Sequence, residues 1–200
     1  MAPYLHPVEK PRGLRMRLVY AITRRQFGKV PTPLAVHSAR MPFAFTSFFF
    51  KVSRLDRKLV VAADTAELVR AQVAATNGCL FCMDSQRWFV MHKSPENLER
   101  LDYLDEYRTN PLFTEAQRAA LDYAVELTRD KHVTPETFER LRQTYSEREI
   151  CDIGWLVASE HLYNVANQGL NVGSDGLCQI PPRRQGGKAE QRAGREALRA

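Results

Sequence analysis

Residues 67–82 of this chain read Glu-Leu-Val-Arg-Ala-Gln-Val-Ala-Ala-Thr-Asn-Gly-Cys-Leu-Phe-Cys, and this stretch decides the fold. Its first ten residues favour a helix. Asn77-Gly78 is typical of a helix C-terminus because both residues accept the left-handed backbone conformation. A second helix is expected to begin at or near Cys79 and to run to about His92. Two cysteines three positions apart on a helix lie on one face, close enough for a disulfide where the backbone permits it.

The same helical signals extend along most of the chain. Thr114 and Ser146 each begin a capping box, in which a side chain at the start of a helix and one three residues later satisfy free backbone N–H groups. Ser94 and Thr134 each precede a proline, which is typical of a helix start. We therefore predict an all-α fold. The further helices that we expect cover residues 14–27, 34–41 and 56–76, with a last one from Ser146 to about Gln168.

A run of phenylalanines lies between residues 43 and 50. Its phenylalanines would favour a strand by propensity alone. Because the neighbouring segments are helical, we predict a helix that is buried or lies at a subunit interface. The run consists of Phe43, Phe45, Phe48, Phe49 and Phe50.

The length of 200 residues suits one domain with tails. We predict an extended basic lead-in over residues 1–12, a helical domain over 13–180, and a basic, disordered tail over 181–200. The net charge of +6 belongs to the ends, because residues 30–182 carry a net charge of −4. Nucleic-acid domains usually carry their basic patch on the folded body, so we expect no nucleic-acid partner.

The composition also bears on the compartment. No apolar run approaches the ~20 residues that a membrane helix requires. The run Leu18–Ile22 is too short for the core of a signal peptide. Four cysteines do not make a secreted disulfide scaffold. We therefore expect a cytoplasmic protein that does not bind membranes.

The position of the cysteines indicates redox chemistry. The start of a helix carries free N–H groups and a partial positive charge, which stabilise a thiolate at Cys79 or Cys82. A thiolate attacks a peroxide to give a sulfenic acid, and a second thiol one turn away displaces water to form a disulfide. We expect the preceding helix to fold back and to place Glu67 beside the sulfurs, as an acid or base.

Two other interpretations of the cysteines remain open. A CxxC pair can be half of a zinc site, but zinc needs two more ligands. The remaining candidates are scattered, so we predict neither a metal nor a cofactor: Cys151, Cys178, His92 and His161. The pair can also be two inert, buried cysteines.

The pattern Glu67-x11-Cys79-x2-Cys82 resembles the core motif of the alkylhydroperoxidase D (AhpD)-like, carboxymuconolactone decarboxylase family. The resemblance covers roughly residues 25–178. It implies an all-helical fold and a homo-oligomer, commonly a trimer or hexamer. It further implies dithiol peroxidase or disulfide reductase chemistry, with Cys82 attacking a hydroperoxide and Cys79 resolving the sulfenic acid. An external lipoyl or thioredoxin-like dithiol would reduce the disulfide, and Glu67 would belong to the proton relay.

The chain departs from that pattern at Gln86, where the AhpD branch has a histidine. A glutamine forms hydrogen bonds but takes up no proton near neutral pH. His92 lies about 15 Å further along the helix than Cys82, too far to act directly. The first hypothesis is a peroxidase that uses Cys79, Cys82, Glu67 and Gln86. The alternatives are a decarboxylase-like enzyme acting on a small lactone or acid, and a non-catalytic oligomer that senses oxidation.

Overall fold

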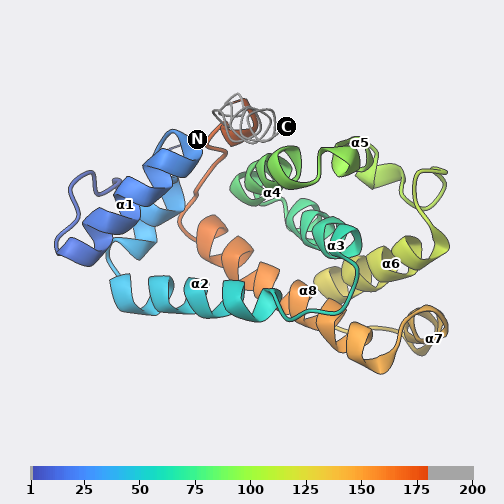
Figure 1. Cartoon of the computed structure of the whole chain (residues 1–200). Coiled ribbons are helices and arrows are strands. Elements are labelled where there is room, and N and C mark those ends of the chain that lie inside the picture. The colour runs from blue at the N-terminus through green and yellow to red at the C-terminus, as the bar shows by residue number, and fades with distance from the viewer. Residues whose placement is uncertain (1, 180–200) are drawn as a thin grey trace, which may run out of the picture.

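The protein is described by a computed structural model that covers residues 2–179, so the predicted tail lies outside the described part. Every regular element in residues 2–179 is helical, which confirms the all-α prediction (Figure 1). None of these helices has the length and hydrophobicity needed to cross a membrane. The longer elements are α1 (Leu14–Phe27), α2 (Pro42–Asp56), α3 (Ala63–Thr76), α4 (Leu80–Lys93), α6 (Glu115–Asp130), α7 (Pro135–Thr144) and α8 (Glu147–Gln168). The shorter ones are η1 (Leu34–Ser38), η2 (Pro95–Asn97), α5 (Leu98–Asp102), η3 (Leu104–Glu106) and η4 (Leu177–Gln179).

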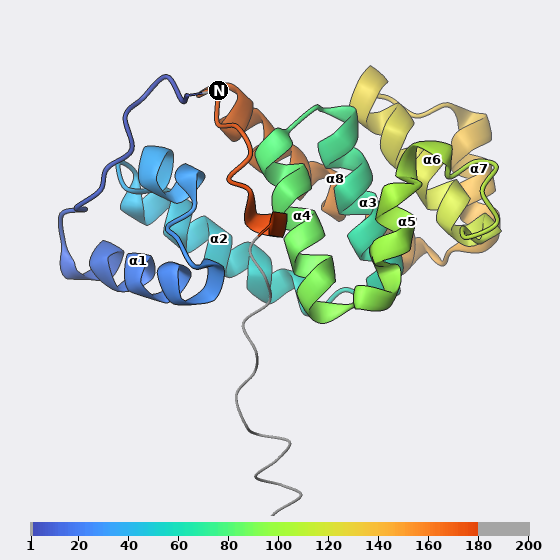
Figure 2. The ribbon, with the colours of Figure 1, turned by 90° about the horizontal axis from the view of Figure 1, so that it is seen from above.

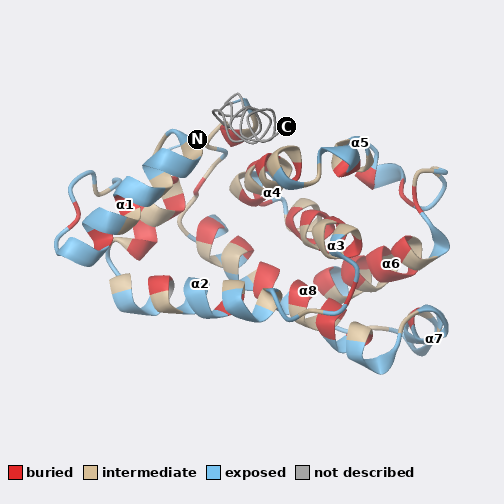
Figure 3. Ribbon diagram, viewed as in Figure 1, coloured by how far each residue is buried: buried red, intermediate tan, exposed pale blue. Residues whose placement is uncertain are grey.

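Helix α3 lies at the centre of the fold and packs against α4, α6 and α8. Its small and β-branched residues allow the neighbouring helices to approach closely. The main core joins α3, α6 and α8 through buried residues that include Val69, Val73, Ala120, Ile153 and Leu156. Figure 3 shows these buried positions gathered on α3, α6 and α8, while α1 and α2 present long exposed stretches. The core therefore holds α3 in a fixed place against α4 and α8.

Local capping chemistry was predicted correctly at three of the four helix starts. Thr114 and Ser146 both form complete capping boxes, and the Thr134 side chain accepts a hydrogen bond from the Thr137 N–H. The helical start predicted at Ser94-Pro95 is present, because Ser94 is the N-cap of η2 and Pro95 is its first residue, but the Ser94 side chain makes no capping hydrogen bond. Its hydroxyl donates instead to the carboxylate of Glu67. Hydrogen bonds to a charged acceptor are stronger than those to neutral groups, so this bond ties Ser94 firmly to α3.

The single helix predicted over residues 56–76 was wrong in its first part. Helix α2 ends at Asp56, and six residues separate it from the start of α3 at Ala63. Asp152 of α8, which is only 1% exposed, accepts hydrogen bonds from the Val60 N–H at 2.6 Å and the Val61 N–H at 3.3 Å. A carboxyl group from a distant helix thus binds the backbone between α2 and α3. Helix propensity depends on local sequence and does not predict such a contact.

The aromatic run is a helix, as predicted, and forms part of α2. Four of its described side chains are exposed within this chain, with exposed fractions from 38% to 73%: Phe43, Phe48, Phe49 and Phe50. The subunit interface therefore stays a prediction.

The lead-in is free of helix up to Leu14 and lies along the body of the protein. The Tyr4 N–H donates to the Leu170 carbonyl at 3.0 Å, and the Val8 N–H donates to the Ala35 carbonyl at 2.9 Å. These bonds bring residues from opposite ends of the sequence together.

A segment that follows α8 returns to the side of α4 and ends in η4 (Figure 2). The carboxylate of Asp84 accepts four hydrogen bonds from it, given by the Ser174 hydroxyl and the backbone N–H groups of Asp175, Leu177 and Cys178, at 2.8 to 3.0 Å. Burial alone would raise the pKa of Asp84, but the hydrogen bonds from Cys178, Leu177 and Ser174 outweigh burial and hold that pKa below its usual value. Asp84 therefore fixes α4 to the C-terminal segment as a charged acceptor.

Candidate active site at the start of helix α4

The two cysteines occupy the first turn of α4. Gly78, at a φ of 68°, makes the turn out of α3, Cys79 is the N-cap of α4, and Cys82 lies one turn further on. Their sulfurs are joined as a disulfide, and the Cα–Cα distance of 5.2 Å is within the range that disulfides adopt. Both residues are buried, at 1% and 3% exposed. The structure thus confirms that the fold brings the two thiols into bonding distance.

Apolar side chains and one amide surround the disulfide. Ala74 of α3 packs against both cysteines, and Phe81 and Tyr163 cover the cluster. The side-chain amide of Asn167 donates to the Cys82 sulfur at 3.4 Å and lies 4.0 Å from the Cys79 sulfur. Burial raises the pKa of Tyr163 to about 12, so its phenol stays neutral near pH 7. Asn167 is therefore the polar side chain aimed at the sulfurs from α8.

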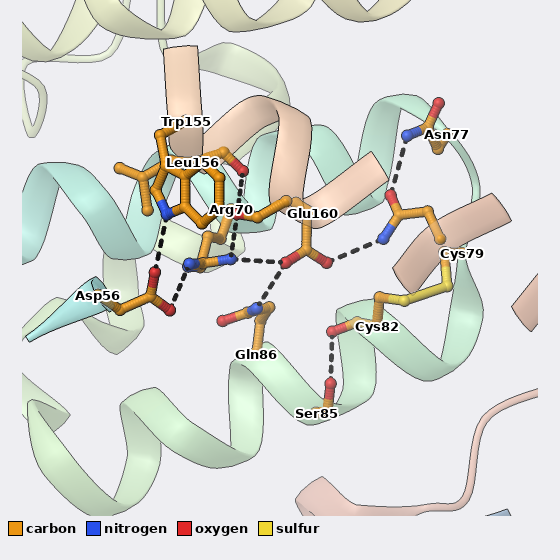
Figure 4. A network of polar contacts seen from close by, with 12 residues as sticks. Asp56, Arg70, Asn77, Cys79, Cys82, Ser85, Gln86, Trp155, Leu156 and Glu160 are labelled. Atoms are coloured by element: carbon orange, nitrogen blue, oxygen red, sulfur yellow. Dashed lines mark hydrogen bonds and ion pairs between the residues drawn. A yellow bond between two sulfur atoms is a disulfide. The ribbon is translucent and has the colours of Figure 1, made fainter. Parts of the chain in front are cut away.

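A buried carboxyl from α8, Glu160, lies on the same side of α4. It is 2% exposed and accepts hydrogen bonds from Asn164 at 2.8 Å, from Gln86 at 3.3 Å and from Arg70 at 3.3 Å (Figure 4). Arg70 also pairs with Asp56 at 2.8 Å. Burial raises the pKa of Glu160, an effect that the nearby Arg70 guanidinium only partly offsets. A carboxyl with a raised pKa can keep its proton long enough to donate it near neutral pH.

Gln86 connects this carboxyl to the cysteine turn. It lies one helical turn after Cys82 on the same face of α4, and its amide donates to Glu160. The position at which the AhpD branch has a histidine therefore contacts a titratable group of another helix. The structure brings Cys79, Cys82 and Gln86 onto one face, as the sequence predicted.

Glu67 is not part of this group. Its carboxylate accepts hydrogen bonds from the Ser94 hydroxyl at 2.6 and 2.7 Å and from the Asn97 amide at 3.0 Å. Ser94 follows Cys82 by twelve residues, which corresponds to about 18 Å along α4. The expectation that Glu67 lies beside the sulfurs was therefore wrong. The two helices do fold back on each other, but Glu67 meets the far end of α4.

Glu160 was not predicted as a site residue, although its position in the sequence marks it. It lies on the buried stripe of α8 with Ile153, Leu156, Val157, Asn164 and Asn167. A charged residue on an apolar helix face is rarely buried unless it is paired. Such a residue therefore marks a candidate site without any knowledge of its partners.

Two histidines lie near the site. His37 of η1 pairs with Asn167 at 3.2 Å, and burial lowers its pKa. His161 pairs with Asn77 at 3.5 Å and with Thr128 at 3.3 Å, and burial lowers its pKa as well. Within residues 2–179, no three His, Cys, Asp or Glu side chains converge in a way that could hold a metal ion.

Comparison with known proteins bears on this fold. No family model matches the chain. The chain is 28% identical over 167 residues to the uncharacterized protein YnjA of Escherichia coli (strain K12), a match that covers 80% of this chain and 88% of YnjA.

Two solved structures illustrate the similarity in three dimensions. One is an uncharacterized peroxidase-related protein with an alkylhydroperoxidase AhpD core from Ralstonia eutropha JMP134. Its TM-score is 0.71 and its sequence identity is 21%, and the match covers 89% of this chain and 95% of the other. Another is the debrominase Bmp8, as a cysteine-to-alanine variant in complex with 2,3,4-tribromopyrrole, with a TM-score of 0.75, 17% identity, and coverage of 90% and 95%. The chain therefore has the AhpD-like fold, which confirms the resemblance seen in the sequence.

Proposed function

We propose that this protein is a dithiol oxidoreductase that reduces hydroperoxides. The observation that supports this most is the Cys79–Cys82 disulfide in the first turn of α4, with the Asn167 amide 3.4 Å from the Cys82 sulfur. The free N–H groups of that turn and the amide both favour a thiolate over a thiol. A reactive thiolate in such surroundings is the nucleophile that peroxide reduction requires.

The reaction proceeds in three balanced steps. The Cys82 thiolate attacks the terminal oxygen of the hydroperoxide, the O–O bond breaks, and the alkoxide takes a proton to leave as an alcohol. Cys82 is then a sulfenic acid. The Cys79 thiol attacks the Cys82 sulfur and releases water, which gives the disulfide. An external dithiol of the lipoyl or thioredoxin type reduces the disulfide by thiol exchange and is itself oxidised to a disulfide.

We assign Glu160 as the proton donor to the leaving oxygen. It is the titratable group that Gln86 contacts, and burial raises its pKa. General acids work best when their pKa lies near the working pH. Glu160 thus takes the part that the sequence resemblance implied for Glu67 and a histidine.

The surroundings of the disulfide fit an organic hydroperoxide. Phe81 and Tyr163 cover the cysteines, and the Phe49 ring meets Tyr163 with a centroid distance of 6.3 Å. Aromatic walls favour a substrate with an apolar body. The exposed phenylalanines of α2 fit the homo-oligomer predicted from the sequence, because exposed aromatic side chains are buried when copies associate. We place this activity in the cytoplasm, where the dithiol reductants are found.

Mass spectrometry of thiol-blocked protein tests the proposal. The reduced protein receives one equivalent of cumene hydroperoxide and then a chase of dihydrolipoamide. We expect rapid formation of a Cys79–Cys82 disulfide, reversal by the chase, and loss of both in Cys82→Ser. Cys151→Ser is the matched control, because Cys151 is an exposed free cysteine outside the site. Two free thiols after the peroxide would overturn the proposal, and a disulfide that forms slowly and is not turned over would favour the redox sensor.

A second candidate, reductive dehalogenation, is favoured by the similarity to Bmp8 over nearly the whole of both chains. In that reaction the dithiol would supply two electrons to a bromoarene, which would release bromide and gain hydrogen while Cys79 and Cys82 form the disulfide. Bromide release from 2,3,4-tribromopyrrole, measured beside cumene hydroperoxide reduction, separates the two candidates. A decarboxylase-like enzyme needs no redox-active pair. Turnover of a small lactone or acid that is retained in Cys79→Ser would therefore favour that alternative.

A further inference from the structure

A histidine far from the cysteines in sequence reaches the site through one side chain. His37 belongs to η1, a short π-helical turn in which the Ala39 N–H donates to the Leu34 carbonyl at 2.9 Å. Single π turns in helical proteins occur frequently at functional sites. His37 and Ser38 are both buried, which is unusual for polar neighbours at the end of a short turn. This arrangement calls for a role that the packing of η1 alone does not supply.

The hydrogen bonds of His37 have a defined direction. Its Nε2 lies 3.2 Å from the Asn167 side-chain oxygen, and an amide oxygen only accepts hydrogen bonds. Nε2 must therefore carry the hydrogen. In a neutral imidazole Nδ1 is then the acceptor, and the Ser38 hydroxyl at 3.2 Å donates to it. Because burial lowers the pKa of His37, the neutral ring is the form present near pH 7.

The Nε2–H tautomer of His37 and the orientation of the Asn167 amide go together. With its oxygen held by His37, the NH₂ group of Asn167 points at the Cys82 sulfur at 3.4 Å. A flipped amide would go with the other tautomer of His37, in which Nδ1 donates to the Ser38 hydroxyl, and would place the amide oxygen against the sulfur. A thiolate is stabilised by a donor and destabilised by an oxygen lone pair.

We propose that His37 is a positioning residue that fixes Asn167 as a hydrogen-bond donor to Cys82 and so stabilises the Cys82 thiolate. The inference rests on the proposed function, since the thiolate is the nucleophile of that reaction. It assigns to a residue of η1, 45 positions before Cys82, a part in setting the reactivity of the thiol. In this role His37 acts on the sulfur through Asn167.

The other ionisable groups around the site do not supply this effect. From α3 and α2, Arg70 and Asp56 form an ion pair at 2.8 Å, so their charges offset each other. Burial raises the pKa of Glu160 on α8, which favours its neutral form. Tyr163 is neutral because burial raises its pKa to about 12. On α4, the carboxylate of Asp84 is bound by Ser174 and the segment that follows it. Burial lowers the pKa of His161, which leaves it neutral near pH 7. The amide of Asn167 and the start of α4 are then the polar groups that act on the sulfur.

The test is the pH dependence of the alkylation of Cys82 by iodoacetamide, read peptide by peptide in protein reduced with dithiothreitol. We expect His37→Leu and Asn167→Leu each to raise the apparent pKa of Cys82 by about one unit, so that its alkylation slows about tenfold at pH values well below that pKa. The double variant should be no slower than either single variant, because both changes remove one interaction. His37→Gln keeps an N–H for Asn167 and should stay within about twofold of wild type by the same reasoning.

Controls keep the result interpretable. His132→Gln changes an exposed histidine outside the site and should leave the profile unchanged. If His37→Leu does not fold, His37→Phe fills the ring volume without a donor and is expected to show the same slowing. A folded His37→Leu or His37→Phe protein with a wild-type profile would overturn the inference, as would additive effects in the double variant. Alkylation needs no peroxide, so an absence of peroxide turnover would reject the proposed function and leave this result readable.

Discussion

The two ends of α4 each hold a carboxyl group from another helix, but in different ways. At the C-terminal end, Glu67 is bound by the Ser94 hydroxyl and the Asn97 amide. At the N-terminal end, Glu160 is bound by Gln86, Asn164 and Arg70, one turn from the cysteines. The motif contains Glu67 and the cysteines, yet the carboxyl near the sulfurs comes from outside it. The spacing of a motif along the sequence thus establishes the helices without establishing which acid serves the site.

The largest difference that we expect between the two ends of α4 is in the rate of peroxide-driven disulfide formation. We expect Glu160→Gln to slow peroxide-driven disulfide formation about 100-fold, because general acid catalysis typically contributes that much. Glu67→Gln, the matched change at the far end of α4, should slow it less than about threefold on the same scale. Stopped-flow measurement with cumene hydroperoxide gives both rates. Equal losses in the two variants would show that Glu67 acts in the relay after all.

Gln86→His restores the residue type of the AhpD branch at a position that already contacts Glu160. A histidine there can carry a proton between Glu160 and the substrate, so we expect a gain of about tenfold in the same rate, below the usual range for a full general acid. The pH profile of the rate should gain a step near the pKa of a histidine. If the rate does not change, the proton moves by a route that does not pass residue 86.

The next comparison concerns the free energy of unfolding. Ser94→Ala removes the hydroxyl that binds Glu67 and should cost about 1.5–3 kcal/mol, the usual net contribution of a hydrogen bond to a charged group, while the Asn97 amide still donates to Glu67. Ser85→Ala, at the cysteine end, removes a hydroxyl that donates only to the Cys82 carbonyl and should cost about 0.5–1 kcal/mol. Urea unfolding measures both. A Ser94→Ala protein that loses peroxide reduction while keeping its stability would contradict the separation of the two ends.

The smallest expected effect is a dependence of stability on pH. The pKa of Glu160 is raised in the fold above its ordinary value of 4.5, so the folded protein binds its proton more tightly than the unfolded chain does. Stability from this group is therefore present below pH 4.5 and is lost as the pH rises toward the folded-state pKa. Glu160→Gln removes the titration, so its stability relative to wild type should increase from pH 4.5 to 8 in urea titrations. A difference that does not vary with pH would show that Glu160 is ionised throughout.

The sequence predicted what local chemistry decides. Thr114 and Ser146 begin helices because their caps use residues only three positions away. It failed where a distant side chain intervenes, as Asp152 does at the break before α3 and as Glu67 does at Ser94. The dithiol was predictable because the cysteines are three positions apart. Glu160 is 74 positions from Gln86, and only its place on an apolar helix face marked it in advance.

The four hydrogen bonds that Asp84 accepts have a consequence for conformational entropy. Reduction of the Cys79–Cys82 disulfide removes the covalent link across the first turn of α4, where helices fray most readily. Asp84, two residues after Cys82, is bound to the segment from Ser174 to Cys178 by hydrogen bonds that do not involve the Cys79 and Cys82 sulfurs. We therefore expect the entropy cost of ordering this turn to be met on folding and not again each time the disulfide forms.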